Sequence, residues 1–208
     1  MLFVKELSEI FQKKLDLEQT PGFILLPQGR GRVPETEDKH MASMILYYSR
    51  AAENYFGGSL RYITKGNTEV VAEKLQALTG ADLFKVEQAT PYSDSYTACT
   101  EEAKRDRQQN ARPALTAFPE HLDKYDTVYL LYPNYWGTMP MAMFTLLEAA
   151  DLSGKTVKPL CTNEGSGMGS SERDIQALCP GARVKAGLAV TGSRVHECDK
   201  ALKAWLAE

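Results

Sequence analysis

The sequence predicts an α/β fold, in which a doubly wound, five-stranded parallel sheet carries helices on both faces. From Met44 onward, short apolar runs alternate with amphipathic stretches, which is the pattern of parallel strands covered by helices. Residues that end or begin helices stand between these stretches, such as Gly80 after one helix and Ser170 or Ser171 before another. The composition, with 43% hydrophobic and 25% charged residues, is that of an ordinary globular protein with one sizeable core.

The expected elements follow in chain order. The apolar runs predict strands at residues 45–48, 81–86, 127–132, 157–161 and 184–190. The amphipathic or charged stretches between them predict helices at residues 67–79, 98–109, 141–150, 171–178 and 195–206. In the first of these helices, Val71, Leu75 and Leu78 share one face. The strand at 127–132 is strongly apolar, as expected for a strand buried on both sides.

Residues 1–43 differ from the rest and are predicted to be an extension in front of a domain at residues 44–208. An amphipathic helix is expected first, with one face made of Phe3, Leu7, Ile10 and Phe11. A linker rich in Gly, Pro and charge follows. The run from His40 to Met44 resembles a vector-derived junction before a native initiator Met44. The alternative is a native extension whose helix docks on the domain or binds a partner.

Composition argues against several classes of protein. The net charge is −3, and no block of basic residues could neutralise a row of phosphates, so nucleic acid is not an expected partner. No apolar run approaches the roughly 18 residues of a membrane span, and Lys5 and Glu6 interrupt any signal peptide, so a cytoplasmic protein is expected. The four cysteines form no C-x-x-C pair and the three histidines are scattered, so neither a metal site nor a catalytic triad is predicted.

The chemistry is expected in three loops beyond the carboxyl ends of the strands, where doubly wound sheets bind ligands. The first loop runs from Ser49 and Arg50 through a long insertion to Gly66-Asn67-Thr68, at the start of a helix. Free N–H groups and hydroxyls there predict a phosphate site. The alternative is a plain helix cap. Arg50 is either a positive charge beside the phosphate or an ordinary surface residue.

The second and third loops are predicted to hold the rest of the ligand. The second loop consists of Pro133, Asn134, Tyr135, Trp136 and Gly137, and its adjacent aromatic residues offer a platform on which a flat ring system can stack. The third loop runs from residue 162 to 170, and its glycines let the backbone approach a ligand. The candidate residues in it are Thr162, Asn163, Glu164, Gly165 and Gly167. A flexible turn is the alternative reading of the third loop.

Together, these loops resemble the constellation of the flavodoxins, and more closely a long-loop branch of flavodoxin-like proteins. The motifs that carry the resemblance are Ser49-Arg50, Gly66-Asn67-Thr68, residues 133–140 and residues 164–167, and the resemblance covers residues 45–206. It implies the strand order 2-1-3-4-5 and one noncovalently bound FMN held by the three loops. The sequence departs from short-loop flavodoxins by an insertion at residues 51–65, in which Tyr55 is a candidate to cover the cofactor.

The resemblance implies an electron-transfer flavoprotein that works with a redox partner protein or a small-molecule electron acceptor and needs no catalytic acid or base of its own. The alternative is an NAD(P)H-dependent quinone or FMN reductase, and the nearly neutral charge weakens the case for an acidic electron carrier. A phosphorylated receiver domain is disfavoured, because its acidic strand ends are replaced here by Tyr48-Ser49 and Tyr132-Pro133.

Overall fold

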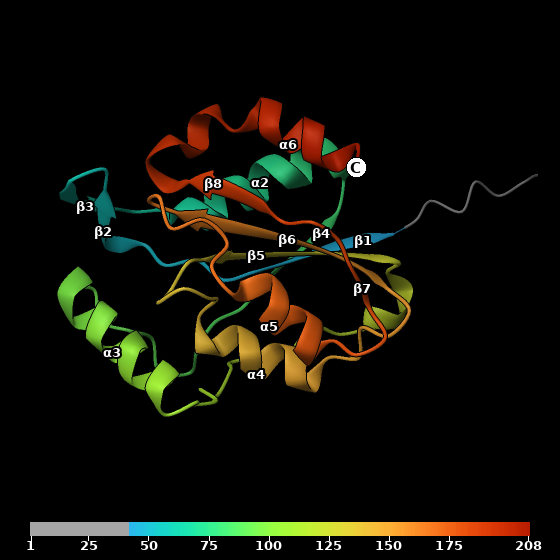
Figure 1. Cartoon of the computed structure of the whole chain (residues 1–208), viewed down its shortest axis with the longest axis horizontal. Coiled ribbons are helices and arrows are strands. Elements are labelled where there is room, and N and C mark those ends of the chain that lie inside the picture. The colour runs from blue at the N-terminus through green and yellow to red at the C-terminus, as the bar shows by residue number, and fades with distance from the viewer. Residues whose placement is uncertain (1–41) are drawn as a thin grey trace, which may run out of the picture. The chain divides into compact units, whose positions relative to one another are not determined.

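A parallel sheet lies at the centre of the computed structural model, which describes residues 42–208 (Figure 1). Its strands are β1 (Ser43–Tyr47), β4 (Asp82–Lys85), β5 (Thr127–Pro133), β6 (Thr156–Asn163), β7 (Arg183–Val184) and β8 (Leu188–Thr191). They lie in the order β4-β1-β5-β6, and β7 and β8 both pair with β6. The fold class and the strand order 2-1-3-4-5 are therefore confirmed, with β7 and β8 in the place of the fifth strand.

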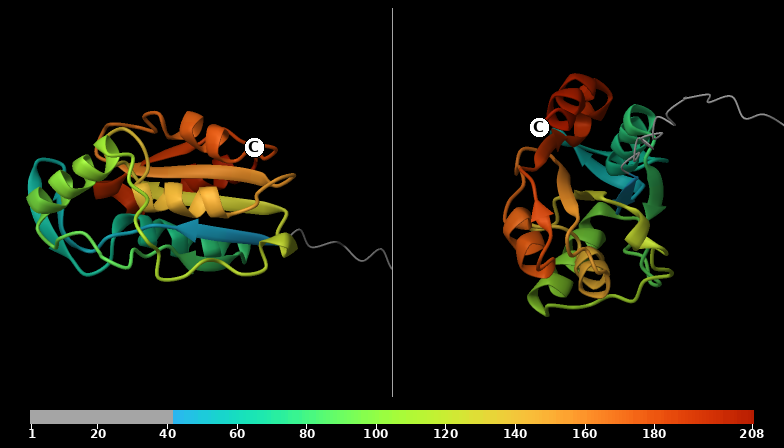
Figure 2. Two further views of the ribbon diagram at one scale, coloured as in Figure 1. Left: turned by 90° about the horizontal axis from the view of Figure 1, so that it is seen from below. Right: turned by 90° about the vertical axis from the view of Figure 1, so that its right-hand side faces the viewer.

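Helices cover both faces of the sheet, as Figure 2 shows. The helices on one face are α2 (Asn67–Thr79) and α6 (Asp199–Leu206), and those on the other are α3 (Tyr96–Gln108), α4 (Met141–Ala149) and α5 (Ser171–Leu178). Two short 3₁₀ helices are η1 (Leu122–Lys124) and η2 (Gly192–Glu197). None of the helices within residues 42–208 is both long and apolar enough to span a bilayer. The helix and linker expected before residue 42 lie outside the described residues.

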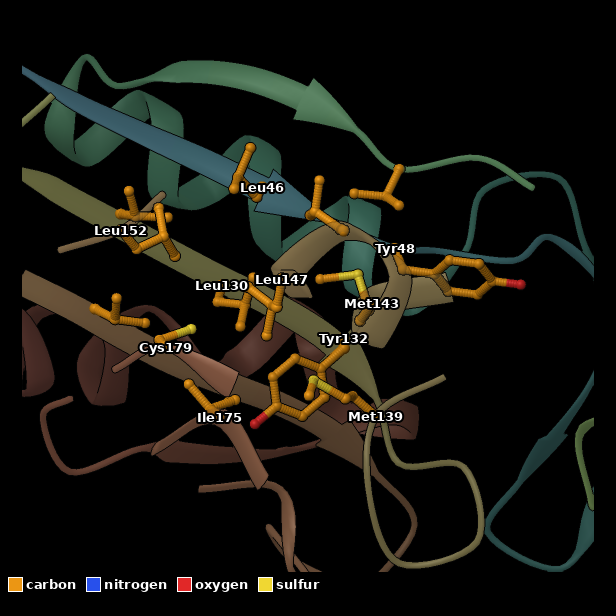
Figure 3. Close-up of a cluster of buried hydrophobic side chains, with 14 of the residues drawn as sticks. Leu46, Tyr48, Leu130, Tyr132, Met139, Met143, Leu147, Leu152, Ile175 and Cys179 are labelled. Atoms are coloured by element: carbon orange, nitrogen blue, oxygen red, sulfur yellow. The ribbon is translucent and has the colours of Figure 1, made fainter. Parts of the chain in front are cut away.

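The core consists of two layers, one on each face of the sheet. Leu46 and Leu130 pack with Leu147 of α4 in one cluster, whereas their chain neighbours Ile45 and Leu131 pack in the other cluster with α2 and α6 (Figure 3). This division follows from strand geometry, because successive side chains point to opposite faces. Burial on both faces explains why the strands are continuous apolar runs in the sequence.

The insertion after β1 forms an antiparallel hairpin that was not predicted. It consists of β2 (Ala52–Phe56) and β3 (Ser59–Ile63), which pair only with each other within the described residues. Gly57 and Gly58 form the turn with φ of 48° and 111°. Two positive φ angles suit a two-residue hairpin turn, so the Gly-Gly pair directly after Tyr55-Phe56 was a usable sequence signal.

The expected continuous strand at residues 184–190 is wrong, because the chain leaves the sheet between β7 and β8. There the Gly187 N–H donates to Glu172 Oε1 (2.7 Å), and the Ala186 carbonyl accepts from Trp205 Nε1 (3.0 Å). A β-carbon at Gly187 would also overlap the side chain of Met168. Side chains of α5 and α6 therefore take the hydrogen bonds that a continuous strand would give to β6.

The last helix begins later than expected. Residues 192–197 form η2, in which Arg194 has non-helical backbone angles (φ −123°, ψ 21°), and α6 begins only at Asp199. Gly192 lies so close to Asn67 and Glu164 that a β-carbon would overlap both side chains. This tight approach places the start of η2 against the loops at the carboxyl ends of the strands.

Candidate functional site

The three predicted loops and the hairpin enclose two adjoining cavities at the carboxyl ends of β1, β5 and β6. The inner cavity measures about 310 Å³ and is lined by Ser49, Arg50, Asn54, Tyr55, Asn67, Thr68, Tyr96, Pro133, Asn134, Tyr135, Thr162, Asn163, Glu164, Ser166 and Gly192. The outer cavity measures about 480 Å³, shares Arg50, Asn54, Tyr96, Asn134, Tyr135 and Ser166 with it, and extends to Trp136 and Gly137. We call the two together the loop cavity. Both volumes are typical of small-molecule sites.

The inner end of the loop cavity is the N-terminus of α2. Gly66 is the N-cap residue in extended conformation, and a β-carbon there would overlap the Ser49 hydroxyl and the Arg50 carbonyl. The Glu69 N–H donates to Ser49 Oγ (3.0 Å). No acceptor within residues 42–208 bonds the N–H groups of Asn67 and Thr68. These two groups and the dipole of a 13-residue helix favour an anion at this end.

The Thr68 hydroxyl already has a hydrogen-bond partner within the protein. It shares a hydrogen bond of 2.8 Å with the hydroxyl of Thr162, and the two residues are only 2% and 4% exposed. The first and third loops are thereby joined beneath the cavity. The contribution of Thr68 to an anion site is therefore its backbone N–H group.

Arg50 has fixed partners, unlike an ordinary surface arginine. Its guanidinium donates to the carbonyls of Glu53 (2.7 Å), Ser93 (2.8 and 3.1 Å) and Asp94 (2.7 Å). These four bonds use four of the five guanidinium N–H groups, which leaves one donor and the positive charge at the cavity wall. Arg50 thus ties the insertion to the segment that precedes α3.

The hairpin is attached to the N-terminus of α3 by a second contact. Glu53 Oε2 accepts a hydrogen bond from the Tyr96 N–H (2.9 Å), which satisfies one of the unpaired donors at the start of this helix. The same contact brings Tyr55 of β2 and Tyr96 of α3 together, with stacked rings whose centroids are 6.2 Å apart. Tyr55 is 40% exposed, so this stacked pair forms the solvent side of the inner cavity.

The second loop separates its two aromatic residues. Trp136 and Gly137 have φ of 55° and 82° and form a two-residue turn, closed by hydrogen bonds between Tyr135 and Thr138. Trp136 Nε1 donates to the Thr100 carbonyl of α3 (2.8 Å), and the indole is 46% exposed. Trp136 therefore lies on α3 at the outer end of the loop cavity, whereas Tyr135 turns inward.

Tyr135 lies in a cluster of phenol rings and one thiol beneath the cavity. Its ring centroid is 6.1 Å from that of Tyr48 and 6.2 Å from that of Tyr92, and its hydroxyl is 3.8 Å from Cys99 Sγ. Burial raises the pKa of the Tyr135 phenol well above its usual value, and it also raises the pKa of the Cys99 thiol and of the Tyr96 phenol. These groups are neutral near pH 7 and form an apolar, aromatic wall.

Asparagine side chains determine the shape of the second and third loops. Asn134 donates from Nδ2 to the Gly167 carbonyl (2.9 Å) and accepts from the Gly137 N–H at Oδ1 (2.9 Å). Asn163 Oδ1 accepts from the N–H groups of both Gly165 and Gly167 at 2.9 Å. The two glycine N–H groups are therefore bonded within the loop.

Glu164 connects the third loop to the hairpin and to η2. Its carboxylate accepts hydrogen bonds from the Gly57 N–H (3.2 Å), the Ser193 N–H (2.5 Å) and the Ser193 hydroxyl (3.0 Å). Gly57 is the first residue of the hairpin turn, so the tip of the hairpin is held above the third loop. The carboxylate is directed to these donors at the edge of the inner cavity.

Comparison with known sequences and structures assigns the family. The sequence model named Flavodoxin matches residues 59–208, which is more than half of the chain. The chain belongs to the flavodoxin family. The match begins at the first residue of β3, so β1 and the Ser49-Arg50 corner of this flavodoxin lie outside it. No curated protein matches the sequence at a significant level.

Several solved structures resemble this flavodoxin along most of its length. A candidate flavoprotein from Bacteroides eggerthii is 27% identical with a TM-score of 0.60, and the match covers 80% of this chain and 96% of that one. A candidate flavoprotein from Bacteroides uniformis is 22% identical with a TM-score of 0.62, covering 80% and 98%. A flavoprotein from Lactobacillus acidophilus, solved in complex with FMN, is 20% identical with a TM-score of 0.56, covering 76% and 97%.

Most of the residues predicted from the sequence line the loop cavity of this flavodoxin. The exceptions among them are Gly66, Gly165 and Gly167, which shape its walls through close packing or loop hydrogen bonds. The prediction missed further lining residues, which are Asn54, Tyr96, Ser166 and Gly192 in the inner cavity and Cys99, Thr100, Glu101 and Ala103 in the outer cavity. Tyr96 directly follows Ser95, a residue type common at helix N-caps, and this was the available signal for an aromatic residue at a helix start.

Proposed function

We propose that this flavodoxin binds one FMN noncovalently in the loop cavity and transfers electrons between a donor and a redox partner protein or small-molecule acceptor. Its membership of the flavodoxin family supports the proposal. So does the Lactobacillus acidophilus flavoprotein, which shares the fold and was solved with FMN bound. The decisive observation is that no acceptor in the described part of the chain bonds the N–H groups of Asn67 and Thr68, which lie at a cavity with aromatic walls.

The phosphate of FMN suits the inner end of the cavity. The N–H groups of Asn67 and Thr68 and the Ser49 hydroxyl are donors of the kind that bind phosphate at a helix N-terminus. Gly66 keeps this end open, because a β-carbon there would overlap Ser49. Arg50 adds one positive charge at the wall of the cavity, and its fifth guanidinium N–H group is available to donate to the phosphate.

The aromatic ring system suits the part of the cavity between the tyrosines. Tyr55 and Tyr96 border it on one side and Tyr135 on another, and these rings offer stacking or edge contacts and exclude water. When bound, FMN supplies one- and two-electron redox chemistry. The chain contributes orientation and electrostatics, and Asn134 and Asn163 hold the second and third loops in place around the ring system.

The proposal is tested by comparing FMN with riboflavin, which lacks the phosphate. The purified chain is reconstituted with each flavin and desalted, and its visible spectrum and dissociation constants are measured. We expect FMN to be retained and riboflavin to bind at least tenfold more weakly, because only FMN reaches the N–H groups at α2. A chain that stays colourless after reconstitution with FMN overturns the proposal.

A pair of substitutions at Asn67 isolates one backbone N–H group. Asn67 is the first helical residue after extended Gly66, a position at which proline is tolerated, so Asn67→Pro removes the N–H and leaves α2 intact. Asn67→Ala removes the same side chain and keeps the N–H. We expect Asn67→Pro to bind FMN about tenfold more weakly than Asn67→Ala, since hydrogen bonds to charged groups contribute about 1.5 kcal/mol or more. Equal affinities would argue against phosphate binding at this end.

A second candidate function is an NAD(P)H-dependent quinone or FMN reductase. The outer cavity of about 480 Å³ leaves room for a second small molecule, and the net charge of −3 is modest for a carrier that attracts basic proteins. The flavin-loaded chain, mixed with NADH or NADPH and a quinone, distinguishes the two functions. Loss of absorbance at 340 nm, at about one turnover per second or faster, would favour the reductase.

A further inference from the structure

A third cavity lies between α3 and α4, beside the loop cavity. It measures about 500 Å³, and its lining includes the basic residues Lys104 and Arg107 and the apolar residues Trp136, Met141 and Phe144. We call it the α3–α4 cleft. Trp136 lines both this cleft and the outer part of the loop cavity. Lys104 and Arg107 line the cleft but not the loop cavity. The proposed FMN site does not require the cleft, so its occupant is a separate question.

The cleft carries two positive charges without ion pairs. Neither Lys104 nor Arg107 forms a salt bridge with any carboxylate in the described part of the chain. The one carboxylate in the lining, Asp174, is already bonded, because Oδ2 accepts from the hydroxyls of Thr138 (2.6 Å) and Ser170 (2.8 Å). Asp174 keeps its negative charge and lies 3.8 Å from Arg173 Nε, so the two cations of the lining still outnumber its one carboxylate, which favours an anionic ligand.

The indole of Trp136 forms the aromatic side of the cleft. The bond from Trp136 Nε1 to Thr100 and the closed turn at Trp136-Gly137 hold the indole on α3. Lys104 Nζ stands 5.1 Å from the centroid of the indole ring, so a cation is held at an aromatic surface. Met141 adds apolar surface on the α4 side, as does Phe144, over whose ring lies the guanidinium of Arg112, which is paired with Glu148. An aromatic surface with two cations beside it suits a flat ring that bears a negative charge.

We propose that the α3–α4 cleft binds a planar aromatic molecule that carries an anionic group, with its ring at Trp136 and its anion at Lys104 and Arg107. The site goes beyond the proposed function and does not depend on it. If FMN occupies the loop cavity, the ligand binds next to the cofactor with Trp136 between the two. If FMN does not bind, the cleft and its charges remain.

The probe for this site is naphthalene-2-sulfonate, with neutral naphthalene-2-sulfonamide as its counterpart of matched shape. The chain has two tryptophans, Trp136 at the cleft and Trp205, which is 3% exposed on the opposite face of the sheet. The two indole N–H signals of the ¹⁵N-labelled full chain are followed during titration, with and without saturating FMN. We expect a saturable shift of the Trp136 signal, no shift of the Trp205 signal, and at least fivefold weaker binding of the sulfonamide.

Two double variants test the charges. Lys104→Ala/Arg107→Ala should weaken sulfonate binding at least tenfold, whereas Lys200→Ala/Lys203→Ala, which removes two exposed charges from α6, should leave it unchanged. Equal binding by the two variants, equal binding of sulfonate and sulfonamide, or equal shifts of both indole signals would overturn the proposal. FMN retention is measured on the same samples. Loss of FMN binding with the cleft still occupied would refute only the proposed function.

Discussion

The hydroxyl groups of Thr68 and Thr162 lie 2.8 Å apart beneath the loop cavity, although 94 residues separate them in the chain. Thr68 is in the first turn of α2 and Thr162 near the end of β6, so their hydrogen bond connects two of the three loops at their base. Both side chains are almost fully buried, so a hydroxyl that loses its partner has little access to bulk water. Loss of this hydrogen bond is therefore expected to lower the free energy of unfolding.

Removing either hydroxyl alone should destabilise the protein. Thr68→Val or Thr162→Val leaves one buried hydroxyl without its partner, which costs about 1–3 kcal/mol in the free energy of unfolding. The double substitution removes both polar groups and should cost less than the sum of the single changes. Urea unfolding of the four proteins measures this coupling. Strictly additive effects would show that the two hydroxyls act independently.

Glu164 should hold the tip of the β2–β3 hairpin. Glu164→Gln keeps the size of the side chain but replaces one acceptor oxygen by a donor, which cannot accept from Gly57 or Ser193. We expect amide hydrogen exchange at Gly57 to become several-fold faster and FMN to dissociate faster, because the hairpin opens more often. The exposed Glu120→Gln serves as the matched control. An unchanged rate of amide hydrogen exchange at Gly57 in Glu164→Gln would show that Glu164 does not hold the tip of the hairpin.

Tyr135 should make the stability sensitive to alkaline pH. Burial raises the pKa of its phenol above the usual value of 10.0, so above this pH the folded state retains a proton that the unfolded state has lost. The stabilisation is therefore complete below about pH 10 and decreases as the pH rises further, by about 1.4 kcal/mol per pH unit for one group. In urea unfolding, the free energy of unfolding of Tyr135→Phe should therefore fall by about 1.4 kcal/mol less than that of the unsubstituted protein between about pH 9 and 11, because one group reaches its full slope only above about pH 11. An identical slope in the variant would exclude Tyr135 as a cause.

The sequence by itself determined the class of fold and the positions of the three loops. Its prediction of α2 agrees with the observed Asn67–Thr79, because the spacing of Val71 and Leu75 and the end signal at Gly80 are local properties of the chain. Strand order followed from the resemblance of the loop motifs to flavodoxins and was confirmed. Local patterns were sufficient wherever a helix or strand depends on its own periodicity.

The tertiary structure alone decided how the loops meet. Arg50 and Glu53 attach the hairpin to the start of α3, which brings Tyr96 to the cavity, and Trp136 bonds to Thr100 and so lies away from Tyr135. The broken fifth strand likewise depends on the bond between Gly187 and Glu172. Each of these contacts joins residues at least 15 positions apart and is made by a side chain that has several possible partners along the chain. Such contacts form only when the packed sheet and helices bring the two residues within hydrogen-bonding distance, and for this reason the final shape of the site is a property of the fold.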